Sequence, residues 1–284
     1  MKVSSVLGRA FKLVGSRLPV FRSCRQGEIS NKRTVPKVPR TTAAGVRGDW
    51  YEPVLLSPAM VGRRALRPET AGQVLMVLDL LEPDEFADYL ARYYRAGLER
   101  FGVEWSYADL PTVLAAATHM LRPASYLEIG VRRGRSMGIV SHIVPEAHLL
   151  GFDLWIPDYA GMDNPGLAFV QDELRKLGHT GCIELIEGDS HQTVPDYFKN
   201  NPDAFFDLIT VDGDHTREGA KADLQAVLPR LKVGGVLVFD DLVHPKHSYL
   251  RDVWREVIAG DRRFASWEFT DLGYGVAIAV RRMD

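Results

Sequence analysis

Acidic side chains follow five successive apolar segments in the second half of the chain. Each segment is a short run rich in Val, Ile, Leu and Phe, which is typical of a buried strand. The acids at or just beyond the segment ends are Glu128, Asp153, Asp189, Asp212, Asp240 and Asp241. Carboxylates gathered at one edge of a sheet repel one another unless they meet hydroxyl groups, cations or a metal ion. The pattern therefore predicts one ligand site built from the ends of all these strands.

The turn after the first of these segments, residues 128–136, contains Gly130 and Gly134. Glycine permits positive φ and lets a ligand approach the backbone closely. A helix is expected next, and its N-terminus favours an anionic group of the ligand. The turn has neither the G-x-G-x-x-G spacing of dinucleotide-binding proteins nor the Gly-Lys-Ser/Thr of a P-loop. Asp153, which closes the second segment, is placed to accept hydrogen bonds from two ribose hydroxyl groups.

The elements that position these residues alternate between strands and helices from Ser125 onward. This alternation predicts a mostly parallel sheet with helices on both faces. Two last segments have no helix between them and are expected to close the sheet as an antiparallel pair. The expected strands are residues 126–130, 149–153, 183–187, 206–212, 236–241, 264–270 and 275–280. We therefore expect residues 122–284 to form an α/β domain, a Rossmann-like, doubly wound, seven-stranded sheet that binds ligands beyond the carboxyl ends of its strands.

A helical section is expected over residues 49–121, in front of the sheet. Two apolar stripes at helical spacing indicate it, one within residues 86–98 and one within residues 110–121. Asp84 and Asp109 are the expected N-caps. The aromatic side chains of the first stripe are expected to pack in the core or against a second copy of the chain in a homodimer.

The charge of the chain is divided unevenly. Residues 1–48 hold eleven Lys and Arg against one acid, a charge of +10, so the rest of the chain carries −12 of the net −2. Such an acidic body is not expected to bind nucleic acid. Residues 1–20 have the spacing of a short basic amphipathic helix, which fits peripheral membrane contact, a transit peptide or a solubilising tail. Residues 26–48 are typical of a linker.

Two further features of the composition bear on location. No apolar run approaches the ~18–20 residues of a membrane span. The two cysteines, Cys24 and Cys182, are too few for a disulfide scaffold and indicate a reducing compartment. A cytoplasmic location is therefore expected.

Five motifs in a fixed order resemble the class I S-adenosylmethionine (SAM)-dependent methyltransferases. They are residues 126–136, 151–153, 187–190, 211–215 and 234–236, and the resemblance spans roughly residues 108–281. In that family the first turn holds the methionine end of SAM, the acid closing the second strand binds the ribose, and the turn after the third strand lies against adenine. The residues implied for the cofactor are Glu128, Gly130, Gly134, Ser136, Asp153, Asp189, Ser190 and Asp212.

Within that family, the run Asp212-Gly213-Asp214 with the pair Asp240-Asp241 is similar to the metal-dependent O-methyltransferases that act on sugars of macrolides and aminocoumarins. The resemblance implies that Asp212, Asp240 and Asp241 hold Mg²⁺, a hard cation that prefers oxygen ligands. The alternative is ordinary turn chemistry, because acids commonly end strands and cap the following helix.

The resemblance makes Asp214 the candidate general base, beside Asp212 and His215 in the candidate catalytic set. His215, His244 and His247 compete for the base role, because the ordinary pKa of histidine suits it better. The expected function is SAM-dependent methylation of a hydroxyl group on a small molecule or glycan, first of all a sugar hydroxyl. A catechol or phenol acceptor, a nicotinamide enzyme, and a non-catalytic module that binds SAM or a nucleotide remain alternatives.

Overall fold

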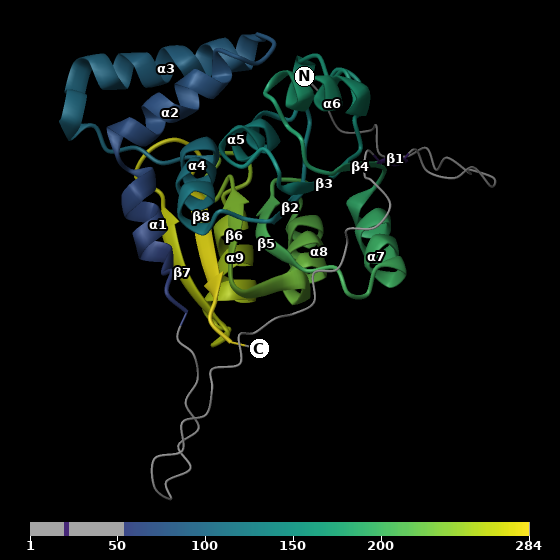
Figure 1. Cartoon of the computed structure of the whole chain (residues 1–284). Coiled ribbons are helices and arrows are strands. Elements are labelled where there is room, and N and C mark those ends of the chain that lie inside the picture. The colour runs from purple at the N-terminus through teal and green to yellow at the C-terminus, as the bar shows by residue number, and fades with distance from the viewer. Residues whose placement is uncertain (1–19, 23–53, 284) are drawn as a thin grey trace, which may run out of the picture.

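The computed structural model describes residues 20–22 and 54–283. Its strands form one sheet in the order β1-β4-β3-β2-β5-β6-β8-β7 (Figure 1). They are β1 (Val20–Arg22), β2 (Ser125–Ile129), β3 (His148–Asp153), β4 (Ile183–Glu187), β5 (Phe206–Val211), β6 (Leu231–Asp240), β7 (Phe264–Phe269) and β8 (Val276–Arg281). Strands β2 to β6 run parallel, and β8 is antiparallel to both of its neighbours. The prediction of a Rossmann-like, doubly wound sheet is confirmed in β2 to β8.

An eighth strand, β1, pairs antiparallel with the edge strand β4. It lies within residues 1–48, where the sequence analysis predicted no strand. Three residues are too few to show a period, and the pairing depends on backbone hydrogen bonds that any side chain permits. The predicted amphipathic helix over residues 1–20 and the linker over residues 26–48 lie almost entirely outside the described residues.

Helices precede the sheet and connect its strands. They are α1 (Pro58–Ala65), α2 (Pro68–Leu78), α3 (Glu85–Phe101), α4 (Leu110–Leu121), α5 (Arg135–Ile143), α6 (Leu167–Lys176), α7 (Ser190–Asn200), α8 (Arg217–Val227) and α9 (Leu250–Trp254). None of the helices in the described ranges is long and apolar enough to cross a membrane. The predicted N-caps are confirmed: Asp84 accepts hydrogen bonds from the backbone at the start of α3, and Asp109 forms a capping box at the start of α4.

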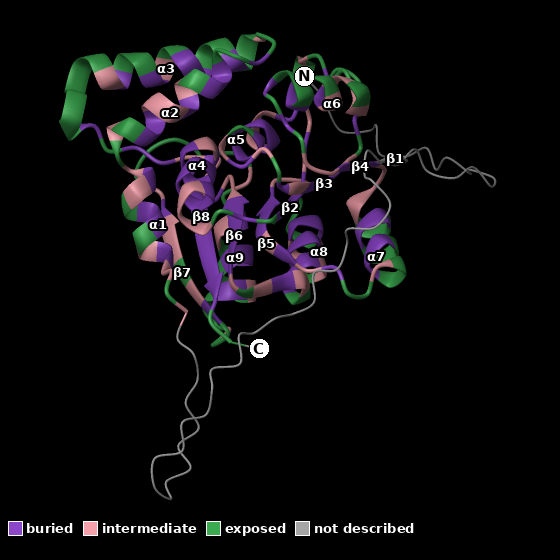
Figure 2. Ribbon diagram, viewed as in Figure 1, coloured by how far each residue is buried: buried purple, intermediate pink, exposed green. Residues whose placement is uncertain are grey.

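The sheet buries both of its faces, as Figure 2 shows by the purple strands between the helices. Alternate residues of each strand contribute to separate apolar clusters. Tyr126 and Leu149 face the cluster that includes α2, α4 and α5, whereas Leu127 and Leu150 face the one that includes α7 and α8. This alternation fixes the register of the strands. Because β2 to β6 are parallel, their carboxyl ends lie at the same edge of the sheet, where the site is.

The helical section joins the first of these clusters through aromatic side chains. Tyr94 is fully buried, and Trp105 stacks on Tyr107 at 5.4 Å between ring centroids. A Cβ at Gly97 would lie 2.2 Å from the Trp105 ring, so α3 approaches this ring only because residue 97 is glycine. The first stripe is not wholly in the core, since Tyr89 remains more than half exposed.

Cys182 is disulfide-bonded. A disulfide bond does not fit the reducing compartment that the cysteine count indicates. The other cysteine of the chain, Cys24, lies outside the described residues.

Candidate active site

The carboxylate of Glu128 is enclosed at the end of β2. It is fully buried, and the Ser136 hydroxyl at the start of α5 donates a hydrogen bond to its Oε1. Its Oε2 is buried without a hydrogen-bond partner among the described residues. Burial above all, with a contribution from the Asp212 charge, raises the pKa of Glu128 from 4.5 to about 8. A buried acceptor without a donor is a place where a ligand donor fits.

The two glycines of the following turn have the conformation that the sequence predicts for them. Gly130 has φ +92° and Gly134 has φ +75°. A Cβ at Gly130 would lie 1.9 Å from the Asp212 carbonyl oxygen, so this turn packs directly on the end of β5. The close approach brings the glycine turn and the Asp212 region together at one edge of the sheet.

Asp153 closes β3 and ties two loops to the site. Its Oδ2 accepts a hydrogen bond from the Arg132 amide at 2.7 Å, and its Oδ1 accepts one from the Trp155 amide at 2.5 Å. Burial raises the pKa of Asp153 against the lowering effect of these hydrogen bonds. Each carboxylate oxygen retains a further lone pair for a hydroxyl group of a ligand.

Asp212, His215 and Asp241 meet at the ends of β5 and β6. The His215 Nε2 lies 3.2 Å from Asp212 Oδ1 and 3.8 Å from Asp241 Oδ2. One ligand atom from each of the three lies within 4.8 Å of the others, close enough to share one cation. Burial lowers the pKa of the imidazole, but the hydrogen bond to Asp212 and the nearby carboxylate charges outweigh it, so the His215 pKa is raised.

Asp240, the third predicted metal ligand, is not a member of this group. Its pKa is raised well above the ordinary value by burial and by the charges of Asp212 and Asp241. The same causes, burial and the Asp212 charge, raise the pKa of Asp241 to about 6. Three carboxylates so close together are costly without a cation, and His215 is the nearest cationic partner that the described chain provides.

Asp214, the predicted base, makes a different set of contacts. Its Oδ1 accepts a hydrogen bond from the Thr216 amide at 2.7 Å, just before α8. A Cβ at Gly219 would collide with its carboxylate, so Asp214 packs against the first turn of that helix. Asp214 is therefore held as a helix-terminus residue beside the Asp212–His215–Asp241 group rather than within it.

The two residues predicted at adenine are engaged at the start of α7. Asp189 accepts a hydrogen bond from the His191 amide at 3.0 Å, and the Ser190 hydroxyl donates to Asp223 at 2.7 Å. Both lie on the turn after β4, at the sheet edge that carries the site. Their predicted contact with the cofactor stays a prediction.

The other candidate histidines line one side of the group. The His247 ring lies 5.2 Å from the His215 ring and 5.0 Å from the His244 ring. Partial burial and the neighbouring cations lower the pKa values of both His244 and His247. The Tyr249 hydroxyl donates a hydrogen bond to the His215 carbonyl at 2.7 Å and fixes the base of this loop.

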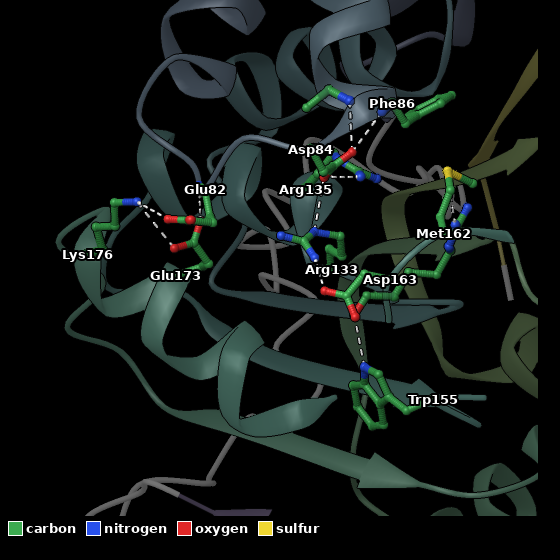
Figure 3. Close-up of polar contacts among 12 residues, drawn as sticks. Glu82, Asp84, Phe86, Arg133, Arg135, Trp155, Met162, Asp163, Glu173 and Lys176 are labelled. Carbon is green, nitrogen blue, oxygen red and sulfur yellow. Dashed lines mark hydrogen bonds and ion pairs between the residues drawn. The ribbon is translucent and has the colours of Figure 1, made fainter. Parts of the chain in front are cut away.

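Sequence reasoning missed a set of ion pairs around the turn that contains Gly130 and Gly134 (Figure 3). Arg133 and Arg135 of the turn both pair with Asp84, and Arg133 also reaches Asp163 in the loop after β3. The signal in the sequence was the run of three arginines between Val131 and Ser136. Because their partners lie many residues away, no local spacing connects them.

The chain is similar to known proteins in sequence and in fold. Residues 127–242 match the family model for a methyltransferase domain. One similar solved structure is the O-methyltransferase TomG from Streptomyces achromogenes, which is involved in tomaymycin synthesis and was solved in complex with SAM. It is 19% identical to this chain, with a TM-score of 0.51, and the match covers 72% of this chain and 92% of TomG. No curated protein matches the chain by sequence.

Two other solved structures are similar at a lower level. CalS11, a TDP-rhamnose 3'-O-methyltransferase of calicheamicin biosynthesis, is 24% identical, covering 76% of this chain and 94% of that one, with a TM-score of 0.47. The O-methyltransferase from Bacillus cereus in complex with SAH is 18% identical, covering 73% and 96%, with a TM-score of 0.49. The family match agrees with the predicted methyltransferase domain over residues 127–242, and the chain shares the fold of TomG.

Proposed function

We propose that this protein transfers the methyl group of SAM to a hydroxyl oxygen of a small molecule or glycan, with a divalent cation assisting. The observation that carries the proposal is the Asp212–His215–Asp241 group beside the glycine turn of the cofactor. It places proton-accepting and cation-binding groups next to the expected methyl donor.

The residues of the first turn fit the cofactor. The unpartnered Oε2 of Glu128 suits the ammonium group of SAM, and Asp153 suits its ribose hydroxyls. Asp189 and Ser190 are proposed to lie against adenine. When bound, SAM supplies an activated methyl group on a sulfonium, and the chain's part is to hold the acceptor oxygen in line with it.

The acidic residues fit a divalent cation such as Mg²⁺. Asp212 and Asp241 offer oxygen ligands within reach of one ion, and a cation there would favour the charged form of the buried Asp240 beside them. A bound cation supplies positive charge that lowers the pKa of an acceptor hydroxyl. In this proposal His215, the third member of the group, does not ligate the ion, so that its ring remains free to accept a proton.

The proton of the acceptor hydroxyl needs a base. As the oxygen–carbon bond forms and the sulfur–carbon bond breaks, the hydroxyl proton passes to a side chain and then to solvent. His215 is the better placed candidate, because the carboxylates beside it stabilise the imidazolium that forms when the neutral ring takes the proton. Asp214, held against α8, is the second candidate.

A methyl-transfer assay with radiolabelled SAM tests the proposal against sugar, catechol and phenol acceptors, with and without Mg²⁺. We expect transfer to a sugar hydroxyl and a rate reduced at least about tenfold in Asp241→Asn. Asp252→Asn, a matched change at an exposed aspartate, is expected to behave as the parent protein. Tight SAH binding without transfer to any acceptor would favour the non-catalytic module instead.

A further inference from the structure

The N-terminus of α3 is linked to the cofactor turn by buried ion pairs. Asp84 caps α3, and its Oδ1 accepts hydrogen bonds from the Phe86 and Ala87 amides at 2.9 and 3.0 Å. Its other oxygen, Oδ2, pairs with Arg133 Nε at 3.0 Å and with Arg135. One carboxylate thus serves a helix cap with one oxygen and the cofactor turn with the other (Figure 3).

These pairs are enclosed by protein. The side chains of Arg133, Arg135 and Asp84 are only 8%, 16% and 18% exposed. Arg135 also lies over the Phe86 ring at 5.1 Å, and Arg133 over the Phe169 ring at 4.4 Å. Two enclosed guanidinium groups next to each other repel unless a carboxylate lies between them, and Asp84 fills that place.

Arg133 also connects the turn to a second loop. Arg133 pairs at 2.9 Å with Asp163, which lies in the loop between β3 and α6 and is 77% exposed. That loop contacts the turn again where the Trp155 indole donates a hydrogen bond to the Arg132 carbonyl at 2.9 Å. We refer to residues 154–166 as the strap.

We propose that Asp84 is a positioning residue for the cofactor: by clamping Arg133 and Arg135 it holds the Gly130–Gly134 turn, and through Asp163 the strap, in the arrangement that binds SAM. The proposal rests on the proposed function, since it concerns the same cofactor site. Asp84 lies on a different element from every residue assigned to the cofactor. Its effect on binding therefore passes through the two arginines.

The test is calorimetric titration of the full chain with SAH, comparing the parent protein with Asp84→Asn. Asparagine caps a helix as well as aspartate does, so the substitution removes the charge and keeps the cap. We expect the Kd for SAH to rise about tenfold, because the turn loses its fixed geometry. The matched control is Asp79→Asn, which breaks an exposed pair between the end of α2 and Arg95 of α3 and is expected to change the Kd less than about twofold.

Different outcomes separate the hypotheses. A parent protein that does not bind SAH refutes the proposed function itself. A parent that binds SAH, with an Asp84→Asn variant that melts at a lower temperature but binds with the same Kd, refutes the clamp and leaves Asp84 a purely structural residue.

A second variant covers the case in which Asp84→Asn does not fold. Asp163 is exposed, so Asp163→Asn is expected to fold and to release SAH about two- to threefold faster, since it loses one link of the strap. In that case an unchanged release rate in Asp163→Asn overturns the proposal.

Discussion

Binding of the cofactor should release a proton from Glu128. The carboxyl group is fully buried, and burial with the Asp212 charge raises its pKa from 4.5 to about 8. At pH 7 roughly nine in ten molecules of the free protein therefore carry this proton. The ammonium group of SAH, placed against the unpartnered Oε2, favours the carboxylate and lowers the pKa again. Binding at pH 7 is thus expected to release close to one proton.

Calorimetric titration in buffers of different ionisation enthalpy measures this number directly, as the slope of the observed heat against that enthalpy. Glu128→Gln removes the titrating group and is expected to bring the slope close to zero and to raise the Kd. Glu99→Gln, at an exposed position on α3, should leave both unchanged. A parent protein whose binding heat is the same in every buffer, or a Glu128→Gln variant that keeps the slope, would refute the reasoning.

The raised pKa of Glu128 also predicts how the free energy of unfolding depends on pH. Because the folded protein binds this proton more tightly than the unfolded chain, the contribution of Glu128 is fully present below the unfolded pKa near 4.5 and is lost as the pH rises through about 8. The shift corresponds to roughly 5 kcal/mol over that interval. Urea unfolding of Glu128→Gln should therefore show a smaller loss of stability between pH 5 and 8 than the parent protein, to an extent of order ~1–5 kcal/mol.

Four further predictions concern the rest of the site and helix α2. Chelation of divalent cations should lower the transfer rate at least about tenfold, with recovery on adding Mg²⁺, and an unaffected rate would remove the cation from the proposal. His215→Gln should lower kcat about 10²–10⁴-fold with little change in the Kd for SAH, whereas a larger loss in Asp214→Asn would move the base to that residue. Gly130→Ala should abolish SAH binding or cost more than about 2 kcal/mol in a melting experiment, because its Cβ would meet the Asp212 carbonyl. Gly72→Ala, where a Cβ meets nothing within 4 Å, should instead stabilise α2 by roughly 0.5–1 kcal/mol.

The parts of the fold that sequence reasoning predicted are those set by local patterns. Strands β2 to β6 and β8 appear as apolar runs because both faces of the sheet are buried there, and the caps Asp84 and Asp109 follow from their own short-range hydrogen bonds. Strand β1 was missed because it depends on pairing with β4 and has no period of its own. Helix α1 lies within the helical section expected over residues 49–121, although its bounds were not predicted.

Sequence reasoning likewise predicted one part of the candidate site and not the other. The sheet topology alone brings Glu128, Asp153 and Asp212 to one edge, because parallel strands end on the same side. Topology does not decide which way a side chain turns after the strand has ended. Asp214 turns to α8 and His215 turns to Asp212, although they are neighbours in the sequence. The order of candidates for the base therefore depends on the structure.

Asp84 shows most clearly what a local pattern leaves undetermined. Its position before an apolar stripe predicts a cap, and the cap is present. Asparagine would satisfy that local requirement equally well, so the cap gives no reason for a charge at this position. Arg133 and Arg135 give that reason, because two enclosed cations need a carboxylate between them. About fifty residues of chain separate these arginines from Asp84, so no local pattern reveals the pairing. Since the charge and the cap use different oxygens of one side chain, a single Asp→Asn substitution separates the non-local role from the local one.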